Sequence, residues 1–266
     1  MYWIRSRLTA NRNNFMKKKM YLSGLLFVMS VLPAFSQENA REAELPEGFV
    51  SLFNGSDFNG WKVPAGDGGH WKVMEGVIDY DAGSEAEKKD LWTEKPYRDF
   101  ILCVDWRIKE TPYRNPNVPI ILPSGLHKLD EHGKEIHMVV PDSDSGILLR
   151  GQSKSQVNIW CWPTGSGEVY GYRMDAEMPA AVRRAVTPVT IADHNIGEWN
   201  TFRITLKDDH LTVVLNGVTV IKDAFLPGLP EDGPIGLQHH GAKNSQGEWI
   251  SPPALVQFRN IFIREI

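Results

Sequence analysis

Residues 201–222 contain three runs of alternating apolar and polar residues joined by short turns, and this pattern limits the fold more than any other part of the sequence. The runs are Thr201 to Lys207, Leu211 to Leu215 and Val218 to Lys222. Alternation with a period of two residues is typical of strands that bury one face. Asn216-Gly217 separates the last two runs, and both residues tolerate the positive φ of a two-residue hairpin turn. The segment therefore predicts antiparallel strands that follow one another in sequence.

Strand-like runs bounded by turn residues recur along the chain, and helical periodicity is scarce. The further runs are 48–53, 70–78, 91–93, 100–109, 146–150, 156–162, 235–238 and 256–263. Such a succession predicts an all-β chain that folds as an antiparallel β-sandwich.

Two long segments interrupt the strands. Residues 111–133 contain four prolines, and residues 174–197 contain two prolines and a short helical piece from Ala180 to Ala185. Loops of this length in a compact domain are often functional. We expect each segment to overhang one face of a sheet; a surface loop without a function is the alternative.

The first 36 residues have the pattern of a secretory signal peptide. Three lysines, Lys17 to Lys19, precede an apolar run from Tyr21 to Leu32, and small residues follow up to Ser36. The run is too short for a spanning helix, and no cysteine follows the expected cleavage point. We therefore expect a mature domain of residues 37–266 that is exported to the periplasm or the medium without a membrane anchor.

The mature chain is expected to be strongly acidic. Removing residues 1–36 takes away six basic residues and leaves 23 basic against 33 acidic ones, a net charge of −10. This charge argues against nucleic acid or an anionic membrane as the partner. The remaining length fits one large all-β domain.

The two cysteines do not suggest a disulfide, although an exported protein permits one. Alternation places Cys103 with Asp105 and Arg107, away from the apolar face of its strand. Cys161 instead shares the apolar face of Val157 and Ile159. Because the thiols point to different layers, two free and partly buried cysteines are favoured.

In each predicted strand, one face is apolar, and the residues that alternate with it lie on the opposite face. These opposite faces carry polar and aromatic residues. Amides and guanidinium groups bind sugar hydroxyls, and indoles cover the C–H face of a sugar ring. The sequence therefore predicts a carbohydrate-binding surface, bordered by Glu168 and Tyr170. Its other candidate residues are Asp105, Arg107, Arg150, Gln156, Asn158, Trp160, Trp162, Gln238 and His240.

Arg150 is the least ordinary of these residues. Alternation puts Ile147 and Leu149 on one face of the strand and Leu148 and Arg150 on the other. A permanent cation in a sheet interior is costly unless it meets a carboxylate, a carbonyl or a polyhydroxylated ligand. A cross-sheet ion pair with Asp105 is the structural alternative.

Three further patterns concern histidines and metal ions. His239 and His240 are adjacent, so in a strand they face opposite ways, and His240 shares the phase of Gln238. Asp142 and Asp144 are a weak candidate for calcium. His132 and His137 flank Glu135 and form a second candidate metal site, for which plain solvation is favoured. A divalent metal ion is thus a candidate cofactor without assigned ligands.

Six motifs in order resemble one known family, the 3-keto-disaccharide hydrolases, over essentially the whole mature chain. The resemblance implies a concanavalin A-like jelly roll with long loops over a concave substrate face, in a secreted protein that cleaves 3-keto-glycosides. The motifs are Phe49-Val50-Ser51-Leu52-Phe53-Asn54-Gly55 with Gly60-Trp61, Asp144-Ser145-Gly146-Ile147 with Arg150, Glu198-Trp199-Asn200, Leu215-Asn216-Gly217, Gly236-Leu237-Gln238 with His240-Gly241, and Phe258-Arg259-Asn260-Ile261.

The resemblance also implies a chemistry. A ketone at C3 acidifies the hydrogen at C2, so a base can remove it and the enolate can expel the C1 substituent. Stopping at the enone makes the enzyme a lyase, and hydration makes it a net hydrolase. This route needs a base near C2, a donor or cation at the C3 oxygen, and an acid or metal near the leaving group. We expect His240 or Glu168 as the base and Arg150 as the enolate stabiliser, with the remaining candidates and Asp144 binding substrate.

The chain departs from the family pattern at two points. Asp144-Ser145-Gly146 replaces the usual Asn-Ser-Gly, and Gln156-Val157-Asn158 replaces a Glu-x-Gln pair. An amide cannot act as a general base, so that role passes to His240, Glu168, Asp105 or Asp144. The loss of the carboxylate makes a non-catalytic carbohydrate-binding module the alternative function.

Overall fold

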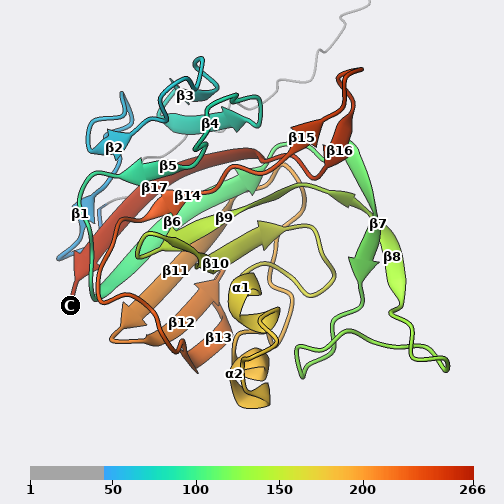
Figure 1. The fold of residues 1–266 in the computed structure, drawn as a ribbon. Helices are drawn as coiled ribbons and strands as arrows, with labels where there is room; N and C mark the ends of the chain where they lie inside the picture. The colour runs from blue at the N-terminus through green and yellow to red at the C-terminus, as the bar shows by residue number, and fades with distance from the viewer. Residues whose placement is uncertain (1–44) are drawn as a thin grey trace, which may run out of the picture. The chain divides into compact units, whose positions relative to one another are not determined.

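The computed structural model describes residues 45–266, so the expected leader lies outside the described residues. Two antiparallel sheets face each other and form most of the structure (Figure 1). The larger sheet has the order β13-β12-β11-β6-β17-β4-β3, with β1 paired to β17. Its strands are β1 (Val50–Ser51), β3 (Trp71–Met74), β4 (Val77–Asp81), β6 (Phe100–Ile108), β11 (Asn200–Lys207), β12 (His210–Leu215), β13 (Val218–Phe225) and β17 (Leu255–Glu265).

The smaller sheet has five strands in the order β10-β9-β14-β5-β2. Two further hairpins stand beside the sandwich, β7 with β8 and β15 with β16. These strands are β2 (Trp61–Lys62), β5 (Leu91–Thr93), β7 (Tyr113–Pro119), β8 (His137–Asp142), β9 (Asp144–Leu149), β10 (Gln152–Trp160), β14 (Gly236–Leu237), β15 (Ala242–Lys243) and β16 (Trp249–Ser251).

The predicted succession of strands at residues 201–222 is confirmed. β11, β12 and β13 are neighbours in the larger sheet, and Leu215 pairs with Val218 across the turn. Asn216 and Gly217 have φ values of 50° and 81°, as a type I′ turn requires. The register between β12 and β13 shifts on either side of Val213, and after these irregularities the buried Val213 pairs with the buried Ile221, whereas Val218 beside the turn is exposed.

The hydrophobic core lies between the two sheets. Ile147 and Leu149 on β9 are fully buried and belong to the same cluster as Phe202 and Ile204 on β11. Each strand therefore turns its apolar phase inward, as the alternation predicted. Leu148, on the other face of β9, is buried outside this core cluster.

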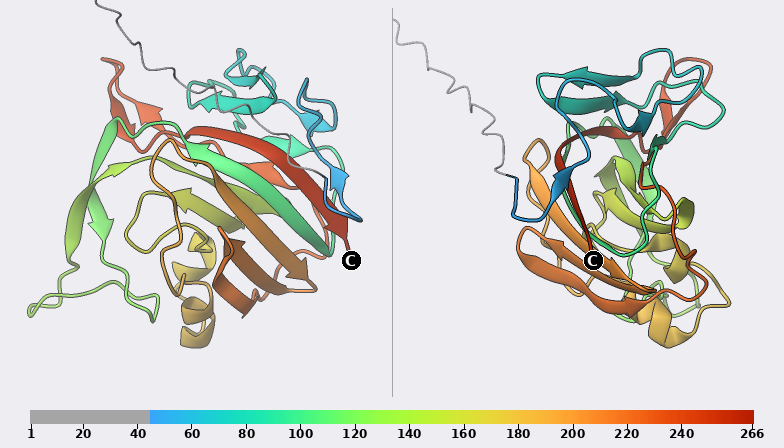
Figure 2. Two further views of the ribbon diagram at one scale, coloured as in Figure 1. Left: turned by 180° about the vertical axis from the view of Figure 1, so that it is seen from behind. Right: turned by 90° about the vertical axis from the view of Figure 1, so that its left-hand side faces the viewer.

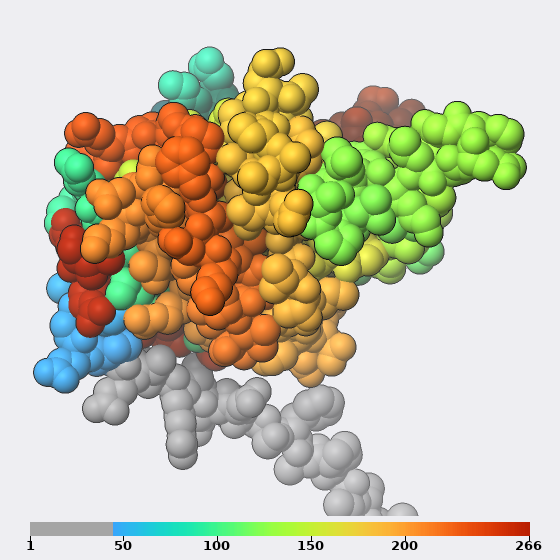
Figure 3. All heavy atoms as spheres, turned by 90° about the horizontal axis from the view of Figure 1, so that it is seen from below, coloured from blue at the N-terminus to red at the C-terminus, as the bar shows by residue number. Residues whose placement is uncertain are grey.

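The proline-rich segment 111–133 is not simply a loop. Tyr113–Pro119 forms β7, which pairs with β8 through an irregular register. Prolines are tolerated because a two-stranded ribbon leaves one side of each strand without partners. Figures 1 and 3 show this segment standing out from the sandwich next to the helical part of the chain.

Two short helices follow β10. Helix α2 (Ala180–Ala185) has the limits that the sequence predicted, whereas α1 (Tyr170–Arg173) was not predicted. Among residues 45–266 no helix is long and apolar enough to cross a membrane. Cys103 and Cys161 are both free and partly exposed, as favoured above.

The sandwich separates two sets of polar residues that the sequence placed together. Since the apolar faces meet in the core, the outward faces of the two sheets lie on opposite sides of the molecule (Figure 2). Asp105 and Arg107 on β6 therefore do not share a surface with the polar residues of β9, β10 and β14. The prediction of a single surface was wrong because alternation gives the face of a strand but not its sheet.

Candidate active site

A pocket of about 280 Å³ lies on the outward face of the smaller sheet, and we call it the polar pocket. It brings together eight of the residues that the sequence singled out, from three neighbouring strands and the segments after them. Asn115 and Pro252 also line it and were not predicted. The complete lining is Asn115, Asp144, Gln156, Asn158, Trp160, Trp162, Tyr170, Gln238, His240 and Pro252.

Three amides form the floor of the polar pocket. The Gln156 Nε2 donates to Asn158 Oδ1 at 2.6 Å and to Gln238 Oε1 at 2.7 Å. Both neighbours therefore present their oxygen atoms to Gln156, which turns their NH2 groups elsewhere. Asn158 and Gln238 thus keep donors available for the oxygen atoms of a ligand.

Gly146 makes this arrangement sterically possible. It lies opposite Asn158 in the sheet, and its carbonyl accepts the backbone N–H of Gln238 at 3.0 Å. A Cβ atom at this position would lie 2.6 Å from Cγ of Gln156. The glycine in Asp144-Ser145-Gly146 therefore leaves the space across which Gln156 joins the other two amides.

His240 and Asp144 form the titratable pair of the pocket. The His240 Nε2 lies 3.9 Å from Asp144 Oδ2, while its Nδ1 contacts the carbonyl oxygen of Pro252 at 2.5 Å. Because a carbonyl only accepts hydrogen bonds, Nδ1 carries the proton. Nε2 is therefore the ring nitrogen that can carry a lone pair, and it lies on the side of Asp144.

The carboxyl of Asp144 has a pKa well above its ordinary value. Burial raises the pKa of its carboxyl to about 7, and a positive charge on His240 acts in the opposite direction. Within residues 45–266 its buried Oδ1 has no hydrogen-bond partner. A carboxyl of this kind can give or take a proton near neutral pH.

Asp142 fixes one wall of the pocket. Its fully buried Oδ2 accepts hydrogen bonds from Asn115 Nδ2 at 2.8 Å and from Trp162 Nε1 at 3.0 Å. Burial raises the pKa of the Asp142 carboxyl. The contact with Asn115 brings strand β7 to the pocket, which the reading of 111–133 as a loop could not show.

Aromatic residues also line the pocket, and they include the Trp162 that Asp142 holds. The rings of Trp160 and Trp162 stack with centroids 4.1 Å apart, and Tyr170 meets Trp160 edge-on at 6.2 Å. Trp160 is only 3% exposed, so Trp162 and Tyr170 offer the accessible ring surface. The prediction of Trp160 as a ligand platform is thus only partly supported, because most of its ring packs inside the protein.

Glu168 does not line the polar pocket, contrary to expectation. Its side chain is completely buried, and Oε1 accepts a hydrogen bond from Arg173 Nε at 2.5 Å. Burial raises the pKa of this carboxyl to about 7, and Arg173 acts in the opposite direction. A carboxylate paired beneath the surface has no route to a substrate, so its assignment as a base was wrong.

Arg150 is also placed away from the pocket. Strand β9 ends at Leu149, and Arg150 has a φ of 49°, so the alternation does not extend to it. Its guanidinium donates to the carbonyls of Arg98 and Pro230 and pairs with Asp99 at 3.0 Å. Neither the predicted role at an enolate nor the alternative pairing with Asp105 is correct.

Asp105 and Arg107 belong to the outward face of the larger sheet. Asp105 accepts hydrogen bonds from Thr201 at 2.7 Å and from Asn260 at 2.7 Å. Arg107 lies 4.6 Å from the ring centre of Trp199. Their expected role in substrate binding at the polar pocket is therefore wrong.

The candidate metal sites are not assembled in the part of the chain that the structure describes. No group of three or more His, Cys, Asp or Glu side chains there is arranged to hold an ion. Glu135 pairs with His137 at 3.4 Å, whereas His132 lies next to Glu131. In the polar pocket, Asp144 and His240 supply two such side chains.

Comparison with known proteins identifies the family. The model of the 3-keto-alpha-glucoside-1,2-lyase-like domain matches residues 48–264. The chain belongs to this family. Membership confirms the resemblance read from the six motifs and makes carbohydrate processing by an enzyme its general activity.

Solved structures confirm the fold as well. Two structures of a "putative glycosyl hydrolase" from Parabacteroides distasonis are similar to it. The first is 23% identical to this chain with a TM-score of 0.53, and the match covers 83% of this chain and 85% of the Parabacteroides chain. The other is 20% identical with a TM-score of 0.51 and covers 83% and 94%. The concanavalin A-like antiparallel sandwich is thus confirmed. A comparison with curated proteins finds no significant match.

Proposed function

We propose that the protein cleaves 3-keto-glycosides by elimination in the polar pocket. The observation that supports this most is the pair formed by His240 and Asp144, because it places a ring nitrogen that can accept a proton next to a carboxyl whose pKa burial raises to about 7. The amide donors of Asn158 and Gln238 complete the set of groups that the reaction needs.

His240 acts as the general base. Its Nδ1 proton is committed to Pro252, so Nε2 is the atom that accepts the C2 hydrogen of the sugar as a proton. The C3 ketone makes this hydrogen acidic, and the electron pair of the C–H bond becomes that of an enolate. A positioned base of this type typically contributes about 10²- to 10⁴-fold to the rate.

Asn158 and Gln238 stabilise the enolate in place of the arginine expected from the sequence. Both amides are held by Gln156 with their NH2 groups free, so they can donate to the C3 oxygen without rearrangement. Donors fixed before the reaction stabilise a developing charge more than mobile ones do.

Asp144 acts as the general acid. As the enolate collapses, the C1–O bond breaks, a C1=C2 bond forms and the leaving oxygen takes the Asp144 proton. The imidazolium of His240 then lies beside a carboxylate, which balances its charge. Water addition at C1 with return of a proton to C2 gives the 3-keto sugar; without it the product is the enone.

The aromatic wall holds the sugar ring. Trp162 and Tyr170 present ring surface in the same pocket as the amides, and the indole of Trp162 is fixed by Asp142. This combination suits a sugar, whose hydroxyl groups need hydrogen bonds and whose C–H faces need apolar contact.

We also propose export with removal of residues 1–36. The sequence of the N-terminus after expression with the full leader tests this directly. A mature chain that begins near Gln37 in the periplasm or the medium supports export, whereas an intact leader on an intracellular protein would contradict it.

The experiment for the reaction uses a 3-keto-glucoside with a chromogenic aglycone in deuterated water, with and without a chelator. Aglycone release with deuterium at C2, or accumulation of the enone, is expected. Binding without turnover would leave only a carbohydrate-binding module. Equal activity on the unoxidised glucoside would contradict the keto-sugar proposal, and loss of activity with the chelator would show that an ion takes part.

A further inference from the structure

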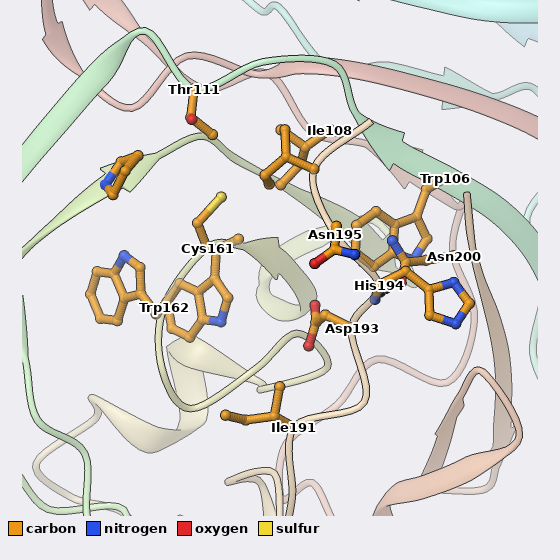
Figure 4. A pocket seen from close by; sticks show the side chains of 13 residues that line it. Trp106, Ile108, Thr111, Cys161, Trp162, Ile191, Asp193, His194, Asn195 and Asn200 are labelled. Atoms are coloured by element: carbon orange, nitrogen blue, oxygen red, sulfur yellow. Dashed lines mark hydrogen bonds between the residues drawn. The ribbon is translucent and has the colours of Figure 1, made fainter. Parts of the chain in front are cut away.

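A second cavity, of about 380 Å³, opens at the end of the sandwich, and we call it the end cavity (Figure 4). Its walls come from β6 of the larger sheet, from the end of β10 and from residues 191–196 after α2. The lining residues are Trp106, Ile108, Thr111, Pro141, Trp160, Cys161, Trp162, Ile191, Asp193, His194, Asn195, Ile196 and Asn200.

The end cavity adjoins the polar pocket. Trp160 and Trp162 line both, so the stacked indoles form a common wall. A sugar held in the polar pocket has a substituent at C1 that must extend beyond the sugar site. The shared wall makes the end cavity the neighbouring space for that substituent.

The chemistry of the end cavity differs from that of the polar pocket. Ile108 and Trp106 belong to the sandwich core, and Ile191 and Ile196 remain 59% and 47% exposed. Apolar side chains left in water around a concave space mark a binding site for an apolar group. Polar residues also line the cavity, but Asp193 accepts from the Ser166 N–H, Asn195 bonds Glu198, and Asn200 accepts from His194 and Asn216. A second sugar ring would therefore find few unused partners for its hydroxyl groups.

A buried donor adds a polar requirement. Trp106 is 2% exposed, and its Nε1 has no hydrogen-bond partner within the described residues. Buried indole N–H groups usually find an acceptor. A ligand that carries an oxygen on an otherwise apolar body would supply one.

The size of the end cavity sets the scale of this ligand. A cavity of about 150 Å³ is large enough for benzene, and the end cavity has about 380 Å³. It therefore has room for a substituted aromatic ring or a bicyclic system.

We propose that the end cavity holds the aglycone, and that the substrates of this protein are 3-keto-glycosides of aromatic, oxygen-bearing alcohols. This inference rests on the proposed function, because it assigns the group that leaves from C1. The segment 174–197, expected to overhang a face, would then contribute Ile191 and Ile196 to substrate selection.

The test compares an aryl and a methyl 3-keto-glucoside in the wild-type protein and two variants. Ile191→Asp places a charge at the mouth of the end cavity. Val189→Asp is the matched control, because Val189 is 79% exposed and does not line the cavity. Differences in leaving ability between the two aglycones cancel when the ratio of their kcat/KM values is compared between variants.

We expect Ile191→Asp to lower the aryl-to-methyl ratio at least tenfold through KM, with methyl turnover unchanged, and Val189→Asp to leave the ratio unchanged. An unchanged ratio in Ile191→Asp would overturn the inference. A binding assay with free 4-nitrophenol, followed by tryptophan fluorescence, separates this result from failure of the proposed function. Saturable binding of 4-nitrophenol that Ile191→Asp weakens and Val189→Asp does not would support the end cavity as the aglycone site even without turnover. Absence of saturable binding would contradict that assignment.

Discussion

The outward faces of the two sheets carry similar residues but use them differently. On the larger sheet, Asp105 accepts hydrogen bonds from Thr201 and Asn260, and Arg107 donates to Gln257 and lies 4.6 Å from the ring centre of Trp199. The buried Nε of Arg259 makes no hydrogen bond within residues 45–266, but it lies 3.5 Å from the Asp105 carboxylate, and its guanidinium lies 4.0 Å from the Trp199 ring centre. On the smaller sheet, Asp144 keeps a buried oxygen that has no partner among residues 45–266, and the amides beside it keep donors available. Residue type alone did not separate the two faces.

The difference shows what distinguishes a candidate active site from a structural face. Polar side chains that satisfy one another stabilise the surface and have nothing left for a ligand. Buried polar atoms that remain unpaired cost free energy unless a ligand pairs with them. We therefore expect substitutions on the outward face of the smaller sheet to change catalysis and equivalent substitutions on the larger sheet to leave it unchanged.

The largest effect is expected for His240→Gln. Glutamine keeps a hydrogen-bonding group but cannot accept the C2 proton, so kcat should fall about 10²- to 10⁴-fold. The measurement is aglycone release from a 3-keto-glucoside, with the melting temperature as a control for folding. Retention of wild-type kcat in a folded variant would remove His240 from the mechanism.

Asp144→Asn should affect activity in a way that depends on the aglycone. For a methyl leaving group, which needs a proton, we expect a loss of about 10- to 100-fold, whereas a nitrophenolate should leave almost as fast as from the wild type. In the wild type, kcat for the methyl substrate should fall as the pH rises through about 7, where the Asp144 carboxyl loses its proton. Equal losses for both leaving groups would argue against an acid at this position.

The same variant tests the electrostatics of folding. The pKa of the Asp144 carboxyl is raised in the folded protein. The contribution of this carboxyl to the free energy of unfolding is therefore fully present below its ordinary pKa of 3.8 and is lost as the pH rises towards 7. Asp144→Asn should therefore gain stability relative to the wild type between about pH 4 and pH 7. Urea unfolding at several pH values measures this, and a pH-independent difference would contradict the buried state of the carboxyl.

Gly146→Ala should have a smaller effect on catalysis. The new Cβ would displace Gln156 and with it the amides of Asn158 and Gln238. A displacement of this kind should lower kcat/KM about tenfold, since small errors of position are costly in an active site. Full activity in the variant would show that the amide row is not needed in its present position.

The smallest effect is expected on the larger sheet. Arg107→Ala removes a partly exposed cation that bonds Gln257 and lies over Trp199. We expect kcat/KM to change less than about twofold and the free energy of unfolding to change by about 1 kcal/mol or less. A large loss of activity would show that the outward face of the larger sheet takes part in catalysis.

The sequence was sufficient for the fold because the fold depends on local patterns. Alternation placed Ile147 and Leu149 in the core, and Asn216-Gly217 gave the hairpin where it was expected. The same reasoning found most of the polar pocket, because Gln156 and Asn158 share a strand face.

The errors concern features that local patterns do not contain. Arg150 follows the last residue of its strand in a left-handed conformation, so extending the alternation by one residue misplaced it. Asp105 was assigned to the wrong side because strand order within a sandwich depends on long-range pairing. Glu168 was misassigned because its partner Arg173 lies in a helix that was not predicted.

The most direct test of the central claim uses a 3-keto-glucoside that carries deuterium at C2, in single turnovers of the wild type and His240→Gln. For the wild type, we expect slower aglycone release from the deuterated substrate than from the undeuterated one, with deuterium appearing in the solvent. For His240→Gln, we expect both aglycone release and deuterium loss to be far slower than in the wild type. Equal release from both substrates without loss of deuterium, or wild-type deuterium loss in His240→Gln, would contradict the central claim.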